Sequence, residues 1–118
     1  MIKASQDYAG EIRSAMRGGS GDVHFEHIWK PAEEMYSKTR LYSKIILEPG
    51  SSIGYHIHEN EEEIFYIIEG TAQYNDNGTV VTLNKGDSCI CLDGETHSIG
   101  NAADAECDLV IFAVILTY

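Results

Sequence analysis

Short apolar stretches recur between residue 40 and the C-terminus, and turn-forming residues separate them. The stretches are rich in β-branched and aromatic residues, and breaks such as Pro49-Gly50, Gly70 and Asn77-Gly78 fall about every eight to twelve residues. The predicted strands are RLYSKIILE (40–48), EIFYIIE (63–69), TAQY (71–74), TVVTL (79–83), DSCICL (87–92), THSI (96–99) and CDLVIFAVILTY (107–118). Because little helical periodicity lies between them, they predict an all-β antiparallel sandwich or barrel.

The N-terminal third has a different pattern. Asp7 is a candidate N-cap for a helix that would end near Met16, and Pro31 predicts one short helical turn in KPAEEM. Between them the segment DVHFEHIW (22–29), with alternating apolar residues, predicts a strand. We therefore expect a single domain over residues 1–118, with an N-terminal arm of about 1–39 and a barrel of about 40–118.

Composition limits the partners and the compartment. The 118 residues are 43% hydrophobic, enough for one sizeable core, and 19 acidic against 8 basic residues give a net charge of −11. This charge repels nucleic-acid phosphates and anionic lipid, so neither is expected as a partner. No segment resembles a signal peptide or membrane span, and three cysteines, including Cys89 and Cys91, do not form a disulfide framework. These features predict a soluble cytoplasmic protein with reduced thiols.

Histidines and glutamates are concentrated in HIHENEEEIFYIIEG, residues 56–70. His56 and His58 would lie on one face of a strand, and His97 follows about forty residues later, after a predicted turn. Imidazoles together with a carboxylate suit manganese, iron, nickel, copper or zinc. The alternative is that the first two histidines are exposed loop residues and the third is a hydrogen-bonded core residue.

The carboxylate is ambiguous from alternation alone. Glu62 and Glu63 point to opposite faces of the predicted strand, and the residues that follow each of them on its face are largely apolar. Glu59 and Glu61 are expected in a solvated loop.

Two motifs resemble those of the cupin family. The first has Gly50, His56, His58, Glu63 and Gly70 with five, one, four and six residues between them. The second has Gly86, Leu92, Gly94, His97 and Asn101 with five, one, two and three residues between them, and it departs from the family pattern only at Leu92, where proline is usual.

The resemblance is strongest to small single-domain cupins of the oxalate-decarboxylase type. It implies a double-stranded β-helix, or jelly-roll, barrel with a metal held by His56, His58, Glu63 and His97. The six-residue spacing to Gly70 matches Glu63, rather than Glu62, to the family's carboxylate ligand. The resemblance also implies a homodimer that uses the N-terminal strand.

The expected cofactor is one divalent transition metal, such as manganese, iron, nickel or zinc, and the expected ligand is a small carboxylate. The protein is then either a metalloenzyme that decarboxylates, dioxygenates or isomerises this ligand, or a non-catalytic binding module. A metal-free barrel that binds sugar hydroxyls is a third hypothesis. Tyr55, Tyr66 and Glu95 are the nearest acid/base groups, and no spacing rule selects a catalytic residue among them. His24 and His27 would face opposite ways and so predict no second metal site.

Overall fold

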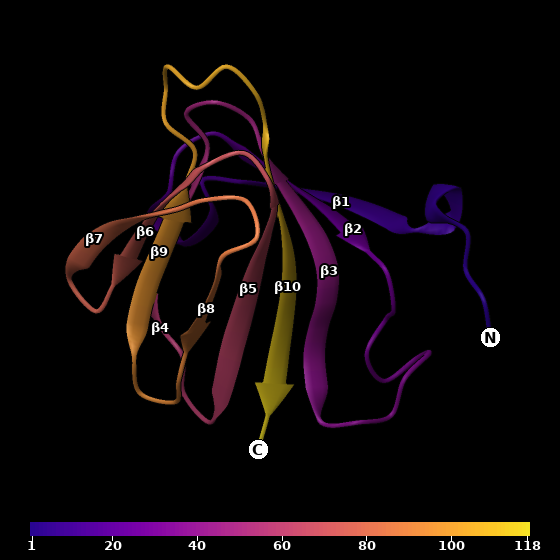
Figure 1. Cartoon of the computed structure of the whole chain (residues 1–118). Coiled ribbons are helices and arrows are strands. Elements are labelled where there is room, and N and C mark those ends of the chain that lie inside the picture. The colour runs from indigo at the N-terminus through magenta and orange to yellow at the C-terminus, as the bar shows by residue number, and fades with distance from the viewer.

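The computed structural model describes all of residues 1–118 as ten strands and two 3₁₀ turns (Figure 1). The strands are β1 (Ala9–Ser14), β2 (Asp22–His27), β3 (Thr39–Leu47), β4 (Ser52–Ile57), β5 (Glu61–Glu69), β6 (Ala72–Asp76), β7 (Thr79–Leu83), β8 (Ser88–Cys91), β9 (Thr96–Gly100) and β10 (Leu109–Thr117). The 3₁₀ turns are η1 (Ser5–Asp7) and η2 (Met16–Gly18). The predicted all-β class is confirmed.

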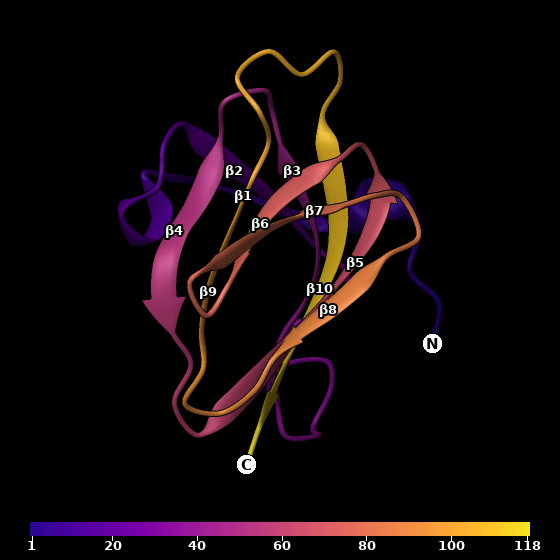
Figure 2. The same cartoon turned by 60° about the vertical axis from the view of Figure 1, so that its left-hand side comes forward.

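The strands form two antiparallel sheets. One has the order β1-β2-β3-β10-β5-β8 and the other has the order β4-β9-β6-β7. Figure 2 shows β4 and β6 on the near side and β10 and β5 beyond them, so that the sheets enclose an interior. Every strand range predicted for the region after residue 40 is present within one or two residues of its expected limits. The strand expected to carry His56 and His58 is β4, which ends at Ile57, so that His58 follows it.

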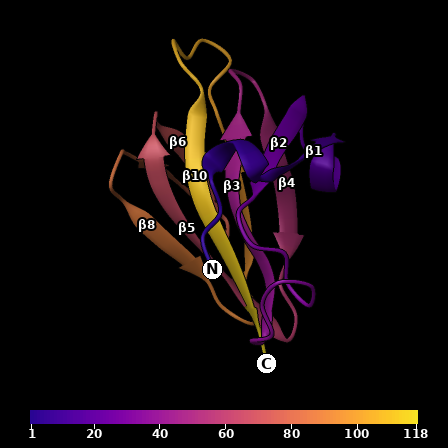
Figure 3. The same cartoon turned by 90° about the vertical axis from the view of Figure 1, so that its right-hand side faces the viewer.

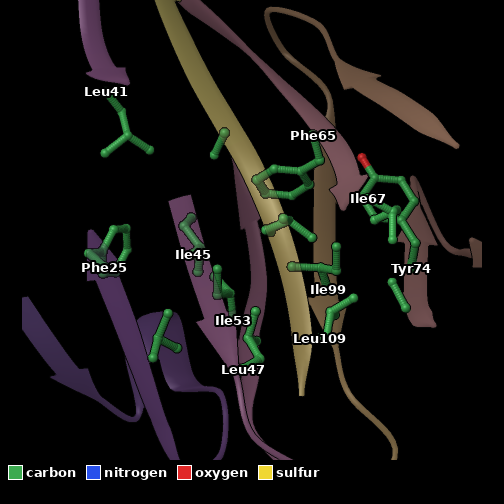
Figure 4. Packing of buried hydrophobic residues seen from close by; sticks show 14 of the residues in the cluster. Phe25, Leu41, Ile45, Leu47, Ile53, Phe65, Ile67, Tyr74, Ile99 and Leu109 are labelled. Carbon is green, nitrogen blue, oxygen red and sulfur yellow. The ribbon is translucent and has the colours of Figure 1, made fainter. Parts of the chain in front are cut away.

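Alternating residues of the strands fill the space between the sheets. In β3, Leu41, Ser43, Ile45 and Leu47 point inward and are buried, whereas their neighbours are half-buried on the outside. Facing side chains from β2, β4, β5, β6, β9 and β10 complete the core (Figure 4). The core fills one part of the barrel interior and leaves the part beside His56, His58 and Glu63 open as a cavity.

The predicted helix from Asp7 to Met16 is wrong. Residues Ala9–Ser14 form β1, which pairs with β2 from Ala9 opposite His27 to Ser14 opposite Asp22, and only η1 and η2 are helical. The physical reason is that β1 satisfies its backbone hydrogen bonds on the edge of β2, a pairing that local propensity does not reveal.

The remaining N-terminal predictions have mixed outcomes. The strand predicted at 22–29 is β2, and it pairs with β3 of the same chain, so the arm is part of the six-stranded sheet (Figure 3). The segment after Lys30 makes one tight turn, closed by the Glu34 amide on the Lys30 carbonyl, with Ala32 in the left-handed region. The structure contains no helix of the length and apolarity that crossing a bilayer requires.

Candidate metal centre

Three strands deliver four side chains to one point inside the barrel. His56 comes from β4, His97 lies opposite it on β9, and Glu63 comes from β5 of the other sheet. His58 lies just after β4 ends, in a segment held by backbone hydrogen bonds to Gly94 and Glu95. One ligand atom from each of the four candidates lies within 4.8 Å of the others.

Their ring nitrogens and carboxylate oxygen converge closely. The Nε2 atom of His58 lies 3.2 Å from Nε2 of His56, 3.0 Å from Nε2 of His97 and 3.1 Å from Oε1 of Glu63. The same oxygen lies 3.1 Å from Nε2 of His97. His58, Glu63 and His97 are almost completely buried, and His56 is half-buried. The cluster is therefore shielded on most sides but open on that of His56.

Each imidazole is oriented by a partner behind it. Nδ1 of His56 donates to the carbonyl of Gly54 at 2.7 Å, and Nδ1 of His58 donates to Oε2 of Glu61 at 2.5 Å. A carbonyl and a carboxylate can only accept, so a neutral ring keeps its proton on Nδ1 and directs a lone pair on Nε2 toward the cluster. This arrangement of outer partners is typical of histidines that bind metals.

The third histidine has a different outer partner. The hydroxyl of Tyr74, on β6, lies 2.8 Å from Nδ1 of His97 and can accept the proton of that nitrogen. Burial raises the pKa of Tyr74, so the hydroxyl stays neutral. The ring of Phe65 stacks on the other side, with centroids 5.2 Å apart, and fixes the plane of the imidazole.

The donor set fits a divalent transition metal. Without an ion, the lone pairs on the inward ring nitrogens and the carboxylate oxygen, about 3 Å apart, repel one another. A proton on Nε2 of His58 would not relieve this repulsion, because it can form a hydrogen bond with only one of the three neighbouring atoms. Bonds of about 2.1 Å from nitrogen or oxygen to such an ion separate adjacent ligand atoms by roughly 3.0–3.4 Å. The spacings of 3.0–3.2 Å fall in this range.

Burial and hydrogen bonding shift the pKa values of the cluster in different directions. Burial lowers the pKa of His56, which favours the neutral ring that a metal needs. Burial opposes ionisation of Glu63 and of His58, but hydrogen bonds outweigh it. Those with Glu63 and Glu61 raise the pKa of His58, so a metal that binds His58 displaces a proton. Hydrogen bonds with His58 and His97 lower the pKa of Glu63. Glu63 is therefore an anion at neutral pH.

The two faces of β5 separate Glu62 from Glu63. Glu63 shares the buried face with Phe65 and Ile67, whereas Glu62 points outward, where the Tyr118 hydroxyl lies 3.4 Å from Oε2. Glu63, and not Glu62, thus lies in the cluster.

Glu61 does not lie in a solvated loop, which corrects our expectation. It begins β5, accepts the Nδ1 proton of His58 and is bound in bidentate fashion by Arg40 at 2.8 and 2.7 Å. The Arg40 hydrogen bond is the main reason that the pKa of Glu61 falls to about 2. The sequence contained one signal, because strand alternation puts Glu61 on the same face as Glu63. Glu59 is exposed, as expected.

Other candidate residues lie elsewhere. Tyr55 and Tyr66 are about half exposed, and Glu95 accepts hydrogen bonds from the Leu92 amide and the Asn77 side chain in neighbouring turns. In place of the usual proline, Leu92 therefore supplies an N–H that this turn uses.

The two inward cysteines and the two N-terminal histidines also stay outside the cluster. Burial raises the pKa of Cys89 to about 11 and that of Cys91 to about 12, so both thiols stay protonated. His24 lies near Glu48, whereas His27 bonds Ser43 and Glu11 on the opposite face of β2, as the sequence predicted.

The fold and the site together define a small β-barrel with an interior cluster of three imidazoles and one carboxylate. Residues 43–114 match the family model described as the cupin domain, so the chain belongs to the cupin family, as its motifs predicted.

Its relatives include a protein named oxalate-binding protein from Thermotoga maritima, which is 42% identical over 116 residues, covering 98% of this chain and 93% of the relative. A crystal structure described as a predicted oxalate decarboxylase from Thermotoga maritima has 42% identity, full coverage of both chains and a TM-score of 0.90. A polyketide cyclase from Streptomyces resistomycificus shares the fold. It is 17% identical, with a TM-score of 0.78 over 99% of this chain and 80% of the cyclase.

Proposed function

We propose that the protein binds one divalent transition metal through His56, His58, Glu63 and His97, and a small carboxylate beside it. The convergence of four donor atoms, with three rings held from behind, is the observation that carries this proposal. When bound, the metal would supply a Lewis acid that polarises the carboxylate. Gly54, Glu61 and Tyr74 would keep the rings oriented.

The choice of ligand has two supports. A relative of 42% identity is named an oxalate-binding protein. In addition, the cluster opens into a cavity of about 450 Å³ whose lining includes four of the eight basic residues of this acidic chain. Carboxylate binding is required both by a metalloenzyme that decarboxylates, dioxygenates or isomerises the ligand and by a non-catalytic module that stores or senses it.

Elemental analysis of the purified protein tests the metal. After expression in metal-replete medium we expect about one equivalent of a transition metal per chain. Glu63→Ala should reduce metal affinity by more than the roughly 10–100-fold typical of an outer partner. Glu62→Ala is the matched control, one residue away and facing outward, and should keep the metal. Metal lost from Glu62→Ala and retained by Glu63→Ala would contradict the ligand set.

We also propose a homodimer, but through a surface other than the N-terminal strand. Val23 and Phe25 of that strand are buried in the core of their own chain, so these apolar side chains are not free to form a contact with a second copy. The outer face of β3, β10, β5 and β8 is instead rich in apolar side chains. Its members include Tyr42, Ile46, Ile64, Tyr66, Ile90, Val110, Phe112 and Val114.

A further inference from the structure

The cavity beside the metal centre has two chemically different parts. Its inner wall is apolar, and the core side chains on it are at most 9% exposed: Phe25, Leu41, Ile45, Ile53 and Ile115. The cationic residues on it are partly or fully exposed and so belong to its opening: Arg13, Arg17, Lys30 and Arg40. A ligand that fills the cavity therefore meets the metal centre, a hydrocarbon surface and a cationic opening.

Two of the four cationic side chains at the opening are not held by a protein carboxylate. Arg13 is paired with Glu11 and Arg40 with Glu61, but neither Arg17 nor Lys30 forms an ion pair. Glu33 also lines the cavity, exposed and without an ion pair. The guanidinium of Arg17 therefore lines the cavity with its donors free of protein carboxylates, and it can bind the carboxylate of an external ligand.

The backbone of Arg17 is held firmly in its place. Ala15 and Arg17 adopt left-handed conformations, with φ of 49° and 54°, that are unfavourable for residues with a Cβ. Strained conformations of this kind persist only where the surroundings enforce them, and they concentrate at functional sites.

Two facing glycines enforce the position. A Cβ on Gly54 would lie 2.1 Å from the Arg17 carbonyl oxygen, and a Cβ on Gly19 would lie 2.2 Å from the Ser52 carbonyl oxygen. Because both lack a Cβ, η2 lies directly on β4, and the carbonyl of Gly54 also orients His56. One short piece of strand thus fixes both Arg17 and a residue of the metal centre.

We propose that the ligand is a dicarboxylic acid with a longer carbon chain than oxalate. One carboxylate would lie at the metal centre, a hydrocarbon segment would pack against the inner wall, and the second carboxylate would bind Arg17, with Lys30 adding charge. A cavity of about 450 Å³ lies in the range of roughly 300–1,000 Å³ that holds ligands much larger than the six heavy atoms of oxalate. This inference rests on the proposed function and narrows its ligand class.

Titration calorimetry of the metal-loaded protein tests the inference with oxalate, the dicarboxylates from malonate to suberate, and hexanoate as the monocarboxylate. We expect the best dicarboxylate to bind at least about tenfold tighter than oxalate or hexanoate. Arg17→Gln should weaken that dicarboxylate about tenfold and change hexanoate less than about twofold. Lys38→Gln is the matched control, because Lys38 is also basic and without an ion pair but lies outside the cavity.

Metal content and thermal unfolding, measured on every variant, should stay at wild-type values because residues 17 and 38 are both exposed. Oxalate as the tightest ligand, or an Arg17→Gln variant that weakens dicarboxylate and hexanoate equally, would overturn this inference and leave the proposed function standing. Metal-loaded protein that binds none of these acids would overturn both this inference and the carboxylate part of the proposed function.

Discussion

Glu61 and Glu63 lie on one face of β5, but their surroundings give them different roles, one as an outer partner of His58 and the other as a candidate ligand. Glu63 is in contact with the ring nitrogens of His58 and His97, whereas Glu61 contacts only the back of His58 and is itself held by Arg40. Arg40, Glu61 and His58 thus form a chain from the cavity opening to the centre. Such a carboxylate fixes the tautomer of its histidine and increases the ring's basicity as a ligand.

Replacing Glu61 should therefore weaken the site without removing a ligand. We expect Glu61→Gln to lower metal affinity by about 10–100-fold, because the amide is a weaker partner for Nδ1 and leaves Arg40 unpaired. Competition with a chelator of known affinity measures this effect. Glu59→Gln, at an exposed neighbouring position, should change affinity less than about twofold. Equal losses in the two variants would argue that only the general acidity of the segment matters.

At the residue scale, the sequence predicted the donors better than their partners. The spacings of His56, His58, Glu63 and His97 could be compared with a motif along the chain. Tyr74 is 23 residues from His97 and meets it only after β6 has paired with β9, so no local pattern indicates its contact. Alternation could not choose between Glu62 and Glu63, because β5 is apolar on both faces: Phe65 and Ile67 point into the core, and Ile64 and Tyr66 point outward.

At the element scale, the region after residue 40 and β2 were predictable, whereas β1 was not. Strands such as β3 and β10 are long and β-branched, so local propensity and final pairing agree. In β1, the sequence AGEIRS is only weakly β-prone, and its conformation depends on pairing with β2 across the η2 turn. Long-range pairing of this kind overrides a local capping signal.

The edge strand β1 should loosen in acid. Hydrogen bonds from Arg13 and His27 are the main reason that the pKa of Glu11 falls from 4.5 to about 2. A lowered folded-state pKa means that the contact stabilises the protein above pH 4.5 and is lost as the pH falls toward 2. Protection factors of the β1 amides, which correct the exchange rates for the pH dependence of intrinsic exchange, should fall more between pH 5 and pH 3 in the wild type than in Glu11→Gln. An equal fall in both proteins would contradict this role of Glu11.

The η2 turn offers a test of backbone strain. Ala15 has φ 49°, so Ala15→Gly should remove a left-handed penalty of about 1–2 kcal/mol and add roughly 0.5–1 kcal/mol of glycine entropy cost. We expect a net stabilisation of about 0.5–1 kcal/mol in urea unfolding. Ala103→Gly, exposed and without a positive φ, should be neutral or destabilising. A destabilised Ala15→Gly would show that the turn is not strained.

At the scale of the whole molecule, charge and apolar surface are unevenly distributed. A net charge of −11 opposes association of like copies, yet Tyr66 and Ile90 are 46% and 44% exposed on the outer face of β5 and β8. An apolar sheet face is the surface on which two copies can approach at the least electrostatic cost.

Light scattering at micromolar concentration should give a dimer mass, and Tyr66→Lys with Ile90→Lys should convert it to a monomer by introducing charge into the contact. Val80→Lys, at a 68% exposed position of β7 in the other sheet, is the control and should remain a dimer. A wild-type monomer would remove the dimer proposal, and a dimer that survives both lysines would move the contact to another face.

The candidate ligands come from both sheets, since His56 and His97 belong to the four-stranded sheet and Glu63 to the six-stranded one. An ion bound by all of them is a reversible cross-link between the two sheets of the barrel. It closes chain loops much as a disulfide does, but its occupancy depends on the concentration of free metal. Metal supply would then govern how rigid this barrel is as well as what it binds.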